Sequence, residues 1–190
     1  MQYSDFSFLI LAGGKSRRMG VNKADLKYHS QTFLETLIFK AQKMGFTDII
    51  ISGYPHEIEG ITPVVDEFKD RGPLGGMYSC FKVAKHKYCF IVCVDVPQLV
   101  EETIFSLIDY HIKEKSELTL LSQNGMAEPL IGIYPTDSYD KIYAIIKDSS
   151  AKVFRLIDQY DYKLFSIDDE TKIMDNINTP EDYQRIIKKP

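Results

Sequence analysis

The segment that most constrains the fold is the apolar run Phe6–Leu11, which leads directly into Ala12, Gly13 and Gly14. A continuous apolar run of this length is typical of a strand buried on both faces of a parallel sheet, and the glycines after it indicate a loop at the strand's carboxyl end. Further strands of this kind are expected at 48–52, 61–65 and 88–94, alternating with segments of helical period. This alternation predicts an α/β fold, a three-layer α/β/α domain with a Rossmann-like, mostly parallel sheet.

Helices are predicted where apolar residues recur every three or four positions. Thr32 and Glu35 form a capping-box pattern before one such segment, which Gly45 ends, and Thr179 with Pro180 marks the start of the last helix. Other helices are expected at 77–85, 101–115, 137–147 and 150–160, and other strands at 118–121, 129–134 and 162–167. The glycine-rich segment 72–76 is predicted to be a loop, and His111 is predicted to lie at the surface.

Length and charge limit the classes of protein to which the chain can belong. At 190 residues, the chain is predicted to form a single domain over 1–190. Its 23 basic and 27 acidic residues give a net charge of −4, which argues against nucleic acid as a partner. The N-terminal apolar run is too short for a membrane span and lacks the features of a signal peptide. Three cysteines without a CxxC pair fit a reducing compartment, so we expect a cytoplasmic protein with no membrane partner.

The loop after the first strand has the composition of a phosphate-binding loop. Its glycines would let backbone amides approach an oxyanion, and the cations Lys15, Arg17, Arg18 and Lys23 would neutralise a polyphosphate. The loop is not a Walker A motif, because Leu9 stands where that motif needs its first glycine, nor does its glycine spacing fit a dinucleotide-binding fingerprint. From composition alone, a phosphate site and a basic turn are equally compatible with this segment.

Two carboxylates, Asp66 and Asp95, follow predicted strands and are therefore candidate site residues, since ligands of open α/β sheets bind beyond the carboxyl ends of the strands. Each has an alternative interpretation: Asp66 as a solvated strand end, and Asp95 as a cap for the segment that begins near Pro97. Cys93 is expected to pack in the core rather than to act as a nucleophile.

The segment Leu11-Ala-Gly-Gly-Lys-Ser-Arg-Arg-Met-Gly-Val-Asn-Lys23 resembles the signature of nucleotidyltransferases with the sugar-nucleotide-transferase fold. More closely, the chain resembles the molybdenum cofactor guanylyltransferases, the MobA family. The further segments that match this family, in order, are Val64-Val-Asp66, Gly72-Pro-Leu-Gly-Gly76, Cys93-Val-Asp-Val-Pro97, Glu128-Pro-Leu-Ile-Gly-Ile-Tyr134 and Asn176-Ile-Asn-Thr-Pro-Glu181. The resemblance covers nearly the whole chain and implies a fold of the nucleotide-diphospho-sugar transferase type.

The resemblance implies a reaction. A MobA-type enzyme transfers GMP from GTP to molybdenum-molybdopterin and releases pyrophosphate, with Mg²⁺ as cofactor. The N-terminal half would bind GTP and the C-terminal half mainly molybdopterin, and other cofactor-biosynthesis proteins and acceptor molybdoenzymes would be further partners. Two alternatives stay open: a cytidylyl or sugar-phosphate nucleotidyltransferase on the same fold, and a molybdopterin carrier without enzymatic activity.

The resemblance also implies roles for particular residues. The expected GTP-binding set is Leu11, Ala12, Gly13, Gly14, Lys23, Asp66 and Asp95, with Arg17, Lys23 and Asp95 in catalysis and Asp95 holding Mg²⁺. Asn176 and Asn178 would lie on the molybdopterin side, although a residue such as Asn178 could also simply form the turn before Thr179. The chain departs from the family pattern at two positions, where Asn22 replaces an aspartate and Ser52 replaces an asparagine.

Overall fold

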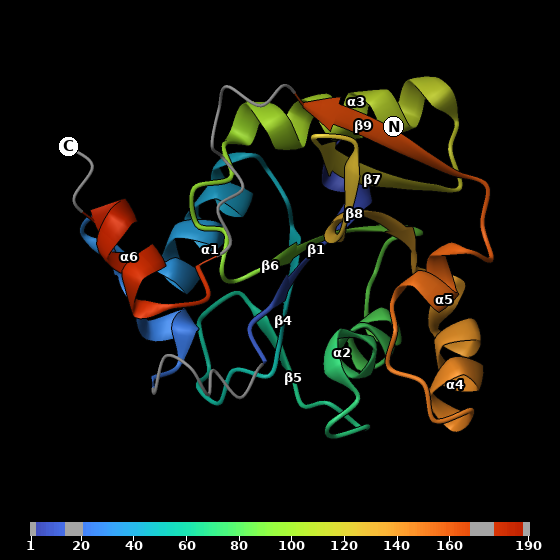
Figure 1. The fold of residues 1–190 in the computed structure, drawn as a ribbon, viewed down its shortest axis with the longest axis horizontal. Coiled ribbons are helices and arrows are strands. Elements are labelled where there is room, and N and C mark those ends of the chain that lie inside the picture. The colour runs from blue at the N-terminus through green and yellow to red at the C-terminus, as the bar shows by residue number, and fades with distance from the viewer. Residues whose placement is uncertain (1–2, 14–20, 168–176, 188–190) are drawn as a thin grey trace.

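The computed structural model describes residues 3–13, 21–167 and 177–187, and its centre is a seven-stranded sheet (Figure 1). The strands are β1 (Phe6–Leu11), β4 (Asp48–Ser52), β5 (Thr62–Val64), β6 (Tyr88–Cys93), β7 (Leu118–Gln123), β8 (Met126–Pro135) and β9 (Tyr162–Ile167). They lie in the order β5-β4-β1-β6-β8-β7-β9, and β8 is antiparallel to both of its neighbours while every other pairing is parallel. The prediction of a mostly parallel sheet is confirmed.

The helices are α1 (Phe33–Lys43), α2 (Gly72–Phe81), α3 (Glu101–Glu114), α4 (Tyr139–Lys147), α5 (Phe154–Ile157) and α6 (Pro180–Ile187). Three short 3₁₀ turns, η1 (Tyr3–Asp5), η2 (Lys23–Asp25) and η3 (Thr136–Ser138), and a small hairpin of β2 (Lys27–Tyr28) and β3 (Gln31–Thr32) complete the described elements. Within the described residues, no helix is long and apolar enough to cross a membrane.

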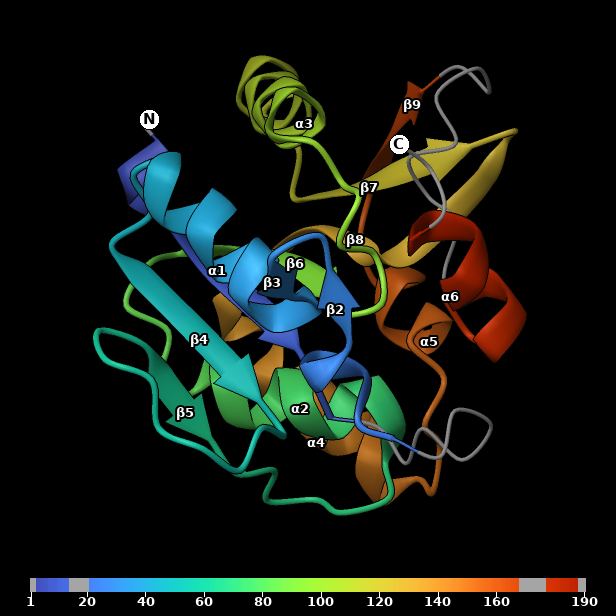
Figure 2. The ribbon, with the colours of Figure 1, turned by 90° about the vertical axis from the view of Figure 1, so that its left-hand side faces the viewer.

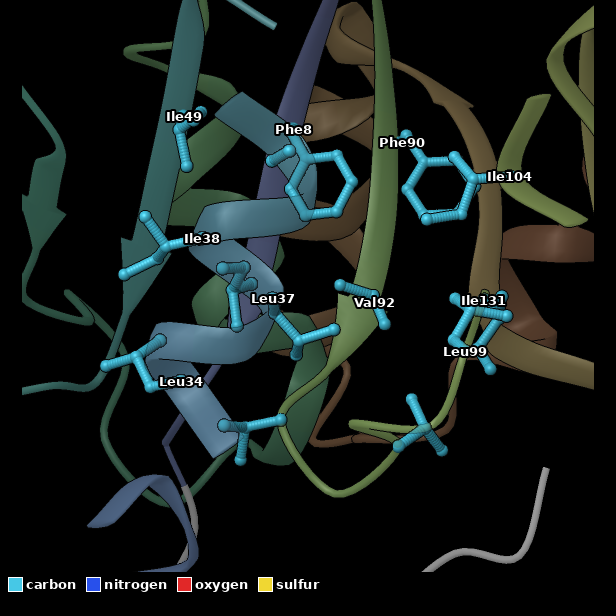
Figure 3. Close-up of a cluster of buried hydrophobic side chains, with 14 of the residues drawn as sticks. Phe8, Leu34, Leu37, Ile38, Ile49, Phe90, Val92, Leu99, Ile104 and Ile131 are labelled. Carbon is cyan, nitrogen blue, oxygen red and sulfur yellow. The ribbon is translucent and has the colours of Figure 1, made fainter. Parts of the chain in front are cut away.

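The two faces of the sheet are covered by different helices, which gives the three layers (Figure 2). Because successive side chains of a strand point to opposite faces, Phe8 and Ile10 of β1 pack with α1 and α3, whereas Leu9 and Leu11 pack with α2 and α4. Figure 3 shows part of the first cluster, in which Phe8 and Phe90 stack with ring centroids 5.3 Å apart. Burial on both faces is the physical reason for the continuous apolar run of β1.

The start of α1 follows the predicted capping box. The backbone amide of Glu35 donates to Thr32 Oγ1 at 3.1 Å, and the backbone amide of Thr32 donates to the Glu35 carboxylate at 2.6 Å. These two bonds satisfy amides that the first helical turn leaves without partners.

The prediction that 72–76 is a loop is wrong, because these residues form the first half of α2. Pro73 fits the first turn of a helix, where its missing amide hydrogen is not needed. Gly75 and Gly76 permit close packing: a Cβ on Gly75 would lie 2.5 Å from the carbonyl oxygen of Phe68, and one on Gly76 would overlap the hydroxyl of Ser52. Tertiary contact, rather than helix propensity, explains these glycines.

Two further predictions are wrong. The expected helix at 150–160 is confined to Phe154–Ile157. His111 is buried rather than exposed; its Nδ1 lies 2.9 Å from Thr119 Oγ1, and its ring packs edge-on against Phe6 and Tyr88. Burial disfavours the charged imidazolium and lowers the pKa of His111 to about 4.

Candidate nucleotidyl-transfer site

The carboxyl ends of β1, β4, β5 and β6 meet at one edge of the sheet, as the parallel pairings require. The chain leaves β1 through α1 on one face of the sheet, while α2, on the other face, leads to β6. In sheets of this type, ligands usually bind beyond the strand at which the connections change face, here β1. Asp66 follows β5 by two residues and Asp95 follows β6 by two residues, so both stand at this edge.

The first feature of the edge is a backbone contact between the segments that follow β1 and β4. Gly53 has φ +74°, and a Cβ on it would overlap the Cα of Gly13. A Cβ on Gly13 would lie 3.4 Å from Gly53 Cα and 3.8 Å from Asp66 Oδ2. Glycine at position 53 therefore lets the two strand ends touch, whereas a Cβ at position 13 would make ordinary contacts there and face the Asp66 carboxylate.

Asp66 is held by Ser52, the buried last residue of β4. Ser52 Oγ donates to Asp66 Oδ1 at 2.7 Å, on the side where Gly76 of α2 offers no Cβ. One oxygen of Asp66 is thereby fixed while the other lies toward Gly13. The protein thus orients the Asp66 side chain, which would not be expected if Asp66 were merely a solvated residue at the end of a strand.

The second feature is a three-residue cluster around the ammonium group of Lys23. Lys23 Nζ lies 3.1 Å from Asp95 Oδ2 and 2.8 Å from Asn178 Oδ1. The ion pair is largely shielded, since the side chains of Lys23 and Asp95 are 15% and 20% exposed. Shielding from water strengthens the attraction between the two charges.

Lys23 reaches this cluster because η2 fixes its backbone. Asn22 caps the turn by accepting a hydrogen bond from the amide of Ala24 at 3.1 Å, and the Ala24 side chain is fully buried. The residue that replaces the family's aspartate therefore acts as a local cap, a role for which an amide oxygen is as suitable as a carboxylate.

Asn178 is positioned by the start of α6. Asp182 Oδ2 accepts hydrogen bonds from the amides of Asn178 and Thr179, and Thr179 Oγ1 accepts one from the amide of Asp182, which completes a cap. The amide of the buried Ile177 donates to the carbonyl of Asp95 at 3.1 Å. The chain just before α6 is thus attached to the loop of Asp95, and the turn-forming interpretation of Asn178 is incomplete.

The cluster fits a divalent cation by the chemistry of its donors. Asp95 offers a carboxylate oxygen and Asn178 an amide oxygen, and both already face a cationic group. Hard oxygen donors of this kind suit Mg²⁺, which keeps water and substrate phosphates for the rest of its coordination shell. No group of three or more His, Cys, Asp or Glu able to hold a metal occurs in the described part of the chain, so a cation here would rely on substrate oxygens.

A cavity of about 120 Å³ lies beside Asp95 and was not predicted from the sequence. Cys93, Val96 and residues 128–131 at the start of the antiparallel β8 complete its lining. Burial and the nearby Asp95 carboxylate raise the pKa of Glu128. The resemblance of Glu128–Tyr134 to a family motif marked this segment in the sequence. Its first residues lie next to Asp95 because β8 runs antiparallel to β6.

The remaining predicted residues are either buried or outside the described part of the chain. Leu11 and Ala12 are buried at the end of β1, where the Ala12 amide donates to the carbonyl of Ser52 at 3.0 Å. Burial raises the pKa of the Cys93 thiol, which agrees with a packing role. Gly14, Arg17 and Asn176 lie outside the described residues.

The chain is similar to known proteins over almost its whole length. A family model described as a MobA-like NTP transferase domain matches residues 8–163. A Clostridium perfringens (strain 13) protein named probable molybdenum cofactor guanylyltransferase is 33% identical to it, over 96% of each chain. The solved structure of molybdopterin-guanine dinucleotide biosynthesis protein A from Archaeoglobus fulgidus superimposes with a TM-score of 0.78 at 18% identity, covering 95% of this chain and 96% of that one.

A Mycobacterium tuberculosis protein solved in complex with manganese has the same fold, with a TM-score of 0.75 at 16% identity, covering 98% of this chain and all (100%) of that one. The family model spans most of the chain and the Clostridium relative nearly all of it. The chain therefore belongs to the MobA-like NTP transferase family and is a nucleotidyltransferase.

Proposed function

We propose that this protein transfers GMP from GTP to the terminal phosphate of molybdenum-molybdopterin, giving the guanine dinucleotide form of the cofactor and pyrophosphate. The observation that carries the proposal is the cluster of Lys23, Asp95 and Asn178 at the carboxyl edge of the sheet. It combines a cation for phosphate with two hard oxygen donors for a metal. The names of the curated relatives support the choice of substrates.

In this reaction an oxygen of the acceptor phosphate attacks the α-phosphorus of GTP, and the bond from that phosphorus to the oxygen of pyrophosphate breaks. Because no protein atom is bonded to the phosphorus, the residues act by positioning and by neutralising charge. Lys23 would contact the triphosphate, and Asp95 would hold Mg²⁺, with the Asn178 amide oxygen beside them on Lys23. The metal would supply charge neutralisation at the phosphate oxygens when bound.

The nucleoside would lie beyond β1. In this proposal Leu11, Ala12 and Gly13 line the guanine and ribose site, and Asp66 contributes through the oxygen that Ser52 leaves free. Gly14 and Arg17 would complete the grip on the triphosphate, and Asn176 would join Asn178 toward molybdopterin. The acceptor would bind mainly to the C-terminal half, next to the cavity beside Asp95.

We expect the other partners to follow from this chemistry. Proteins that make or carry molybdopterin and molybdoenzymes that receive the product would contact the chain, which would work in the cytoplasm as one domain over 1–190. Neither nucleic acid nor a membrane is part of the proposal. A net charge of −4 supports the first of these exclusions.

The assay is pyrophosphate release with each nucleoside triphosphate, with and without molybdenum-molybdopterin. We expect release only with GTP and the acceptor together. A preference for CTP would identify a cytidylyltransferase on the same fold, and absence of release with every nucleotide would favour a carrier that binds molybdopterin without transfer.

Two variants test the site. Lys23→Met and Asp95→Asn each remove one charge from the cluster and should lower kcat by about 100-fold or more, the size expected for losing a charge partner of the transition state. Lys43→Met is the matched control, because Lys43 of α1 forms an ion pair with Glu101 of α3 at the surface, away from the cluster. Rates within a few-fold of the unmodified protein for both site variants would refute the catalytic role of the cluster.

A further inference from the structure

The loop that carries Asp95, here called the Asp95 loop (residues 94–100), connects β6 to α3 and has few backbone bonds of its own. Within it, the amide of Val96 donates to the carbonyl of Cys93 at 3.4 Å and that of Leu99 to the carbonyl of Val96 at 3.1 Å. Val96 and Leu99 bury their side chains in the core. Their burial fixes the loop's inner side but leaves carbonyl groups facing α1.

Lys40 of α1 is the hydrogen-bond donor for these carbonyl groups. Its Nζ donates to the carbonyl oxygens of Pro97 and Leu99, each at 2.7 Å, and these residues stand two and four positions after Asp95. In the described chain no carboxylate lies within ion-pair distance of Lys40. Burial lowers the pKa of Lys40. The nearby Glu101 and Glu102 carboxylates act in the opposite direction on this pKa, but the hydrogen bonds of Lys40 go to the two carbonyls, as expected of a loop anchor.

The hydrogen bonds that join Asp95 itself to the rest of the protein involve residues before it or its own carbonyl. Before Asp95, the amide of Val94 donates to the carbonyl of Leu11 at 3.1 Å, and the carbonyl of Asp95 itself accepts from Ile177. After Asp95, Lys40 provides the side-chain bonds to the loop. The direction of the Asp95 carboxylate therefore depends on its ion pair with Lys23 and on the placement of its backbone by β1, the chain before α6 and Lys40.

We propose that Lys40 is a positioning residue for the metal and nucleotide site, acting through the Asp95 loop and not by contact with substrate. This inference rests on the proposed role of Asp95 as a metal ligand. Residues that orient a ligand typically change metal affinity by about 10- to 100-fold when they are replaced.

The sign of the effect separates positioning from electrostatics. Lys40 is positively charged, so removing its charge alone would leave the affinity for a divalent cation unchanged or increase it. If Lys40 positions Asp95, removing it must lower that affinity. Lys43, one turn further along α1 and 63% exposed, carries the same charge without contacting the loop and is the matched control.

The experiment measures Mn²⁺ binding to the full chain saturated with a non-hydrolysable GTP analogue, from the loss of the free-ion EPR signal beyond that caused by the analogue alone. Mn²⁺-dependent pyrophosphate release from GTP is the second readout. We expect Lys40→Met to weaken Mn²⁺ binding about 10-fold and to lower kcat more than it raises KM for GTP. Lys40→Arg, which keeps two donors, should bind within about threefold of the unmodified protein, and Lys43→Met should be unchanged.

Mn²⁺ affinity unchanged or increased in Lys40→Met, or reduced equally in Lys43→Met, overturns the proposal. If Lys40→Met does not fold, Lys40→Gln, which keeps one donor, is subject to the same criterion. The Asp95→Asn variant separates the proposed metal role of Asp95 from the positioning role of Lys40. If Asp95→Asn binds Mn²⁺ as the unmodified chain does, the metal role of Asp95 fails. If it loses Mn²⁺ while Lys40→Met does not, only the role of Lys40 fails.

Discussion

Replacing Gly76 with alanine tests how tightly α2 packs against the residue that orients Asp66. The added Cβ would overlap Ser52 Oγ and lie 3.1 Å from Leu11 Cδ2 and 3.2 Å from Ser52 Cβ. Because Ser52 ends a buried strand, its backbone cannot move away without disturbing β4. The hydroxyl must instead rotate and lose its bond to Asp66.

The expected loss of stability is the sum of opposing effects. Overpacking in a core costs about 1–3 kcal/mol, and losing a hydrogen bond to a charged acceptor costs about 1.5–3 kcal/mol. Alanine in place of glycine inside a helix returns about 1 kcal/mol. We therefore expect Gly76→Ala to lower the free energy of unfolding by about 1.5–5 kcal/mol and to weaken GTP binding through the displaced Asp66.

A double-mutant cycle with Ser52→Ala isolates the contact. In the Ser52→Ala background the overlapping hydroxyl is absent, so Gly76→Ala should cost at least about 1.5 kcal/mol less than in the unmodified chain. The chain has no tryptophan, so urea unfolding is followed by far-UV circular dichroism. Equal costs in the two backgrounds, or a stabilising effect of Gly76→Ala alone, would refute the packing argument.

Three further predictions concern stability and thiol reactivity. Burial holds the pKa of His111 at about 4, against about 6.5 in the unfolded chain, so the free energy of unfolding should be highest above pH 6.5 and fall by up to about 3 kcal/mol as the pH approaches 4. A His111→Leu variant with the same dependence of stability on pH would show that His111 is not the group responsible. Thr32→Ala breaks the capping box of α1 and should lower the unfolding free energy by about 1 kcal/mol in urea titrations, whereas no change would show that the cap contributes nothing. Because burial raises the pKa of Cys80 in α2 and of Cys89 and Cys93 in β6, a thiol reagent at pH 7 should modify them slowly in the native protein and quickly in urea. Fast native modification would show that α2 or β6 opens.

Local patterns predicted the elements whose burial repeats regularly. Phe6–Leu11 and Asp48–Ser52 form strands with the expected bounds, because an apolar run buried on both faces carries its own signal. The errors occur where tertiary contacts override local preference. Two adjacent glycines in 72–76 predicted a loop, but they lie in a helix because that helix packs directly on Ser52 and on the carbonyl of Phe68.

His111 shows the same limit. Its polarity predicted exposure, yet Thr119 offers a partner and two aromatic rings enclose the imidazole. A neutral histidine with a satisfied nitrogen can be buried at small cost, and no pattern along the helix identifies that partner.

By itself, the sequence determined the fold class, the mostly parallel sheet and the family to which the chain belongs, because these depend on apolar periodicity and on motifs in a fixed order. It also identified Lys23, Asp66, Asp95 and Asn178 one at a time. Only the tertiary structure decided that Lys23 binds Asp95 and Asn178, which stand 72 and 155 positions away. The same holds for the support of Asp66 by Ser52 and of the Asp95 loop by Lys40. Such contacts follow from the order of strands and the packing of helices on them, so they join residues whose separation along the chain carries no signal of their proximity.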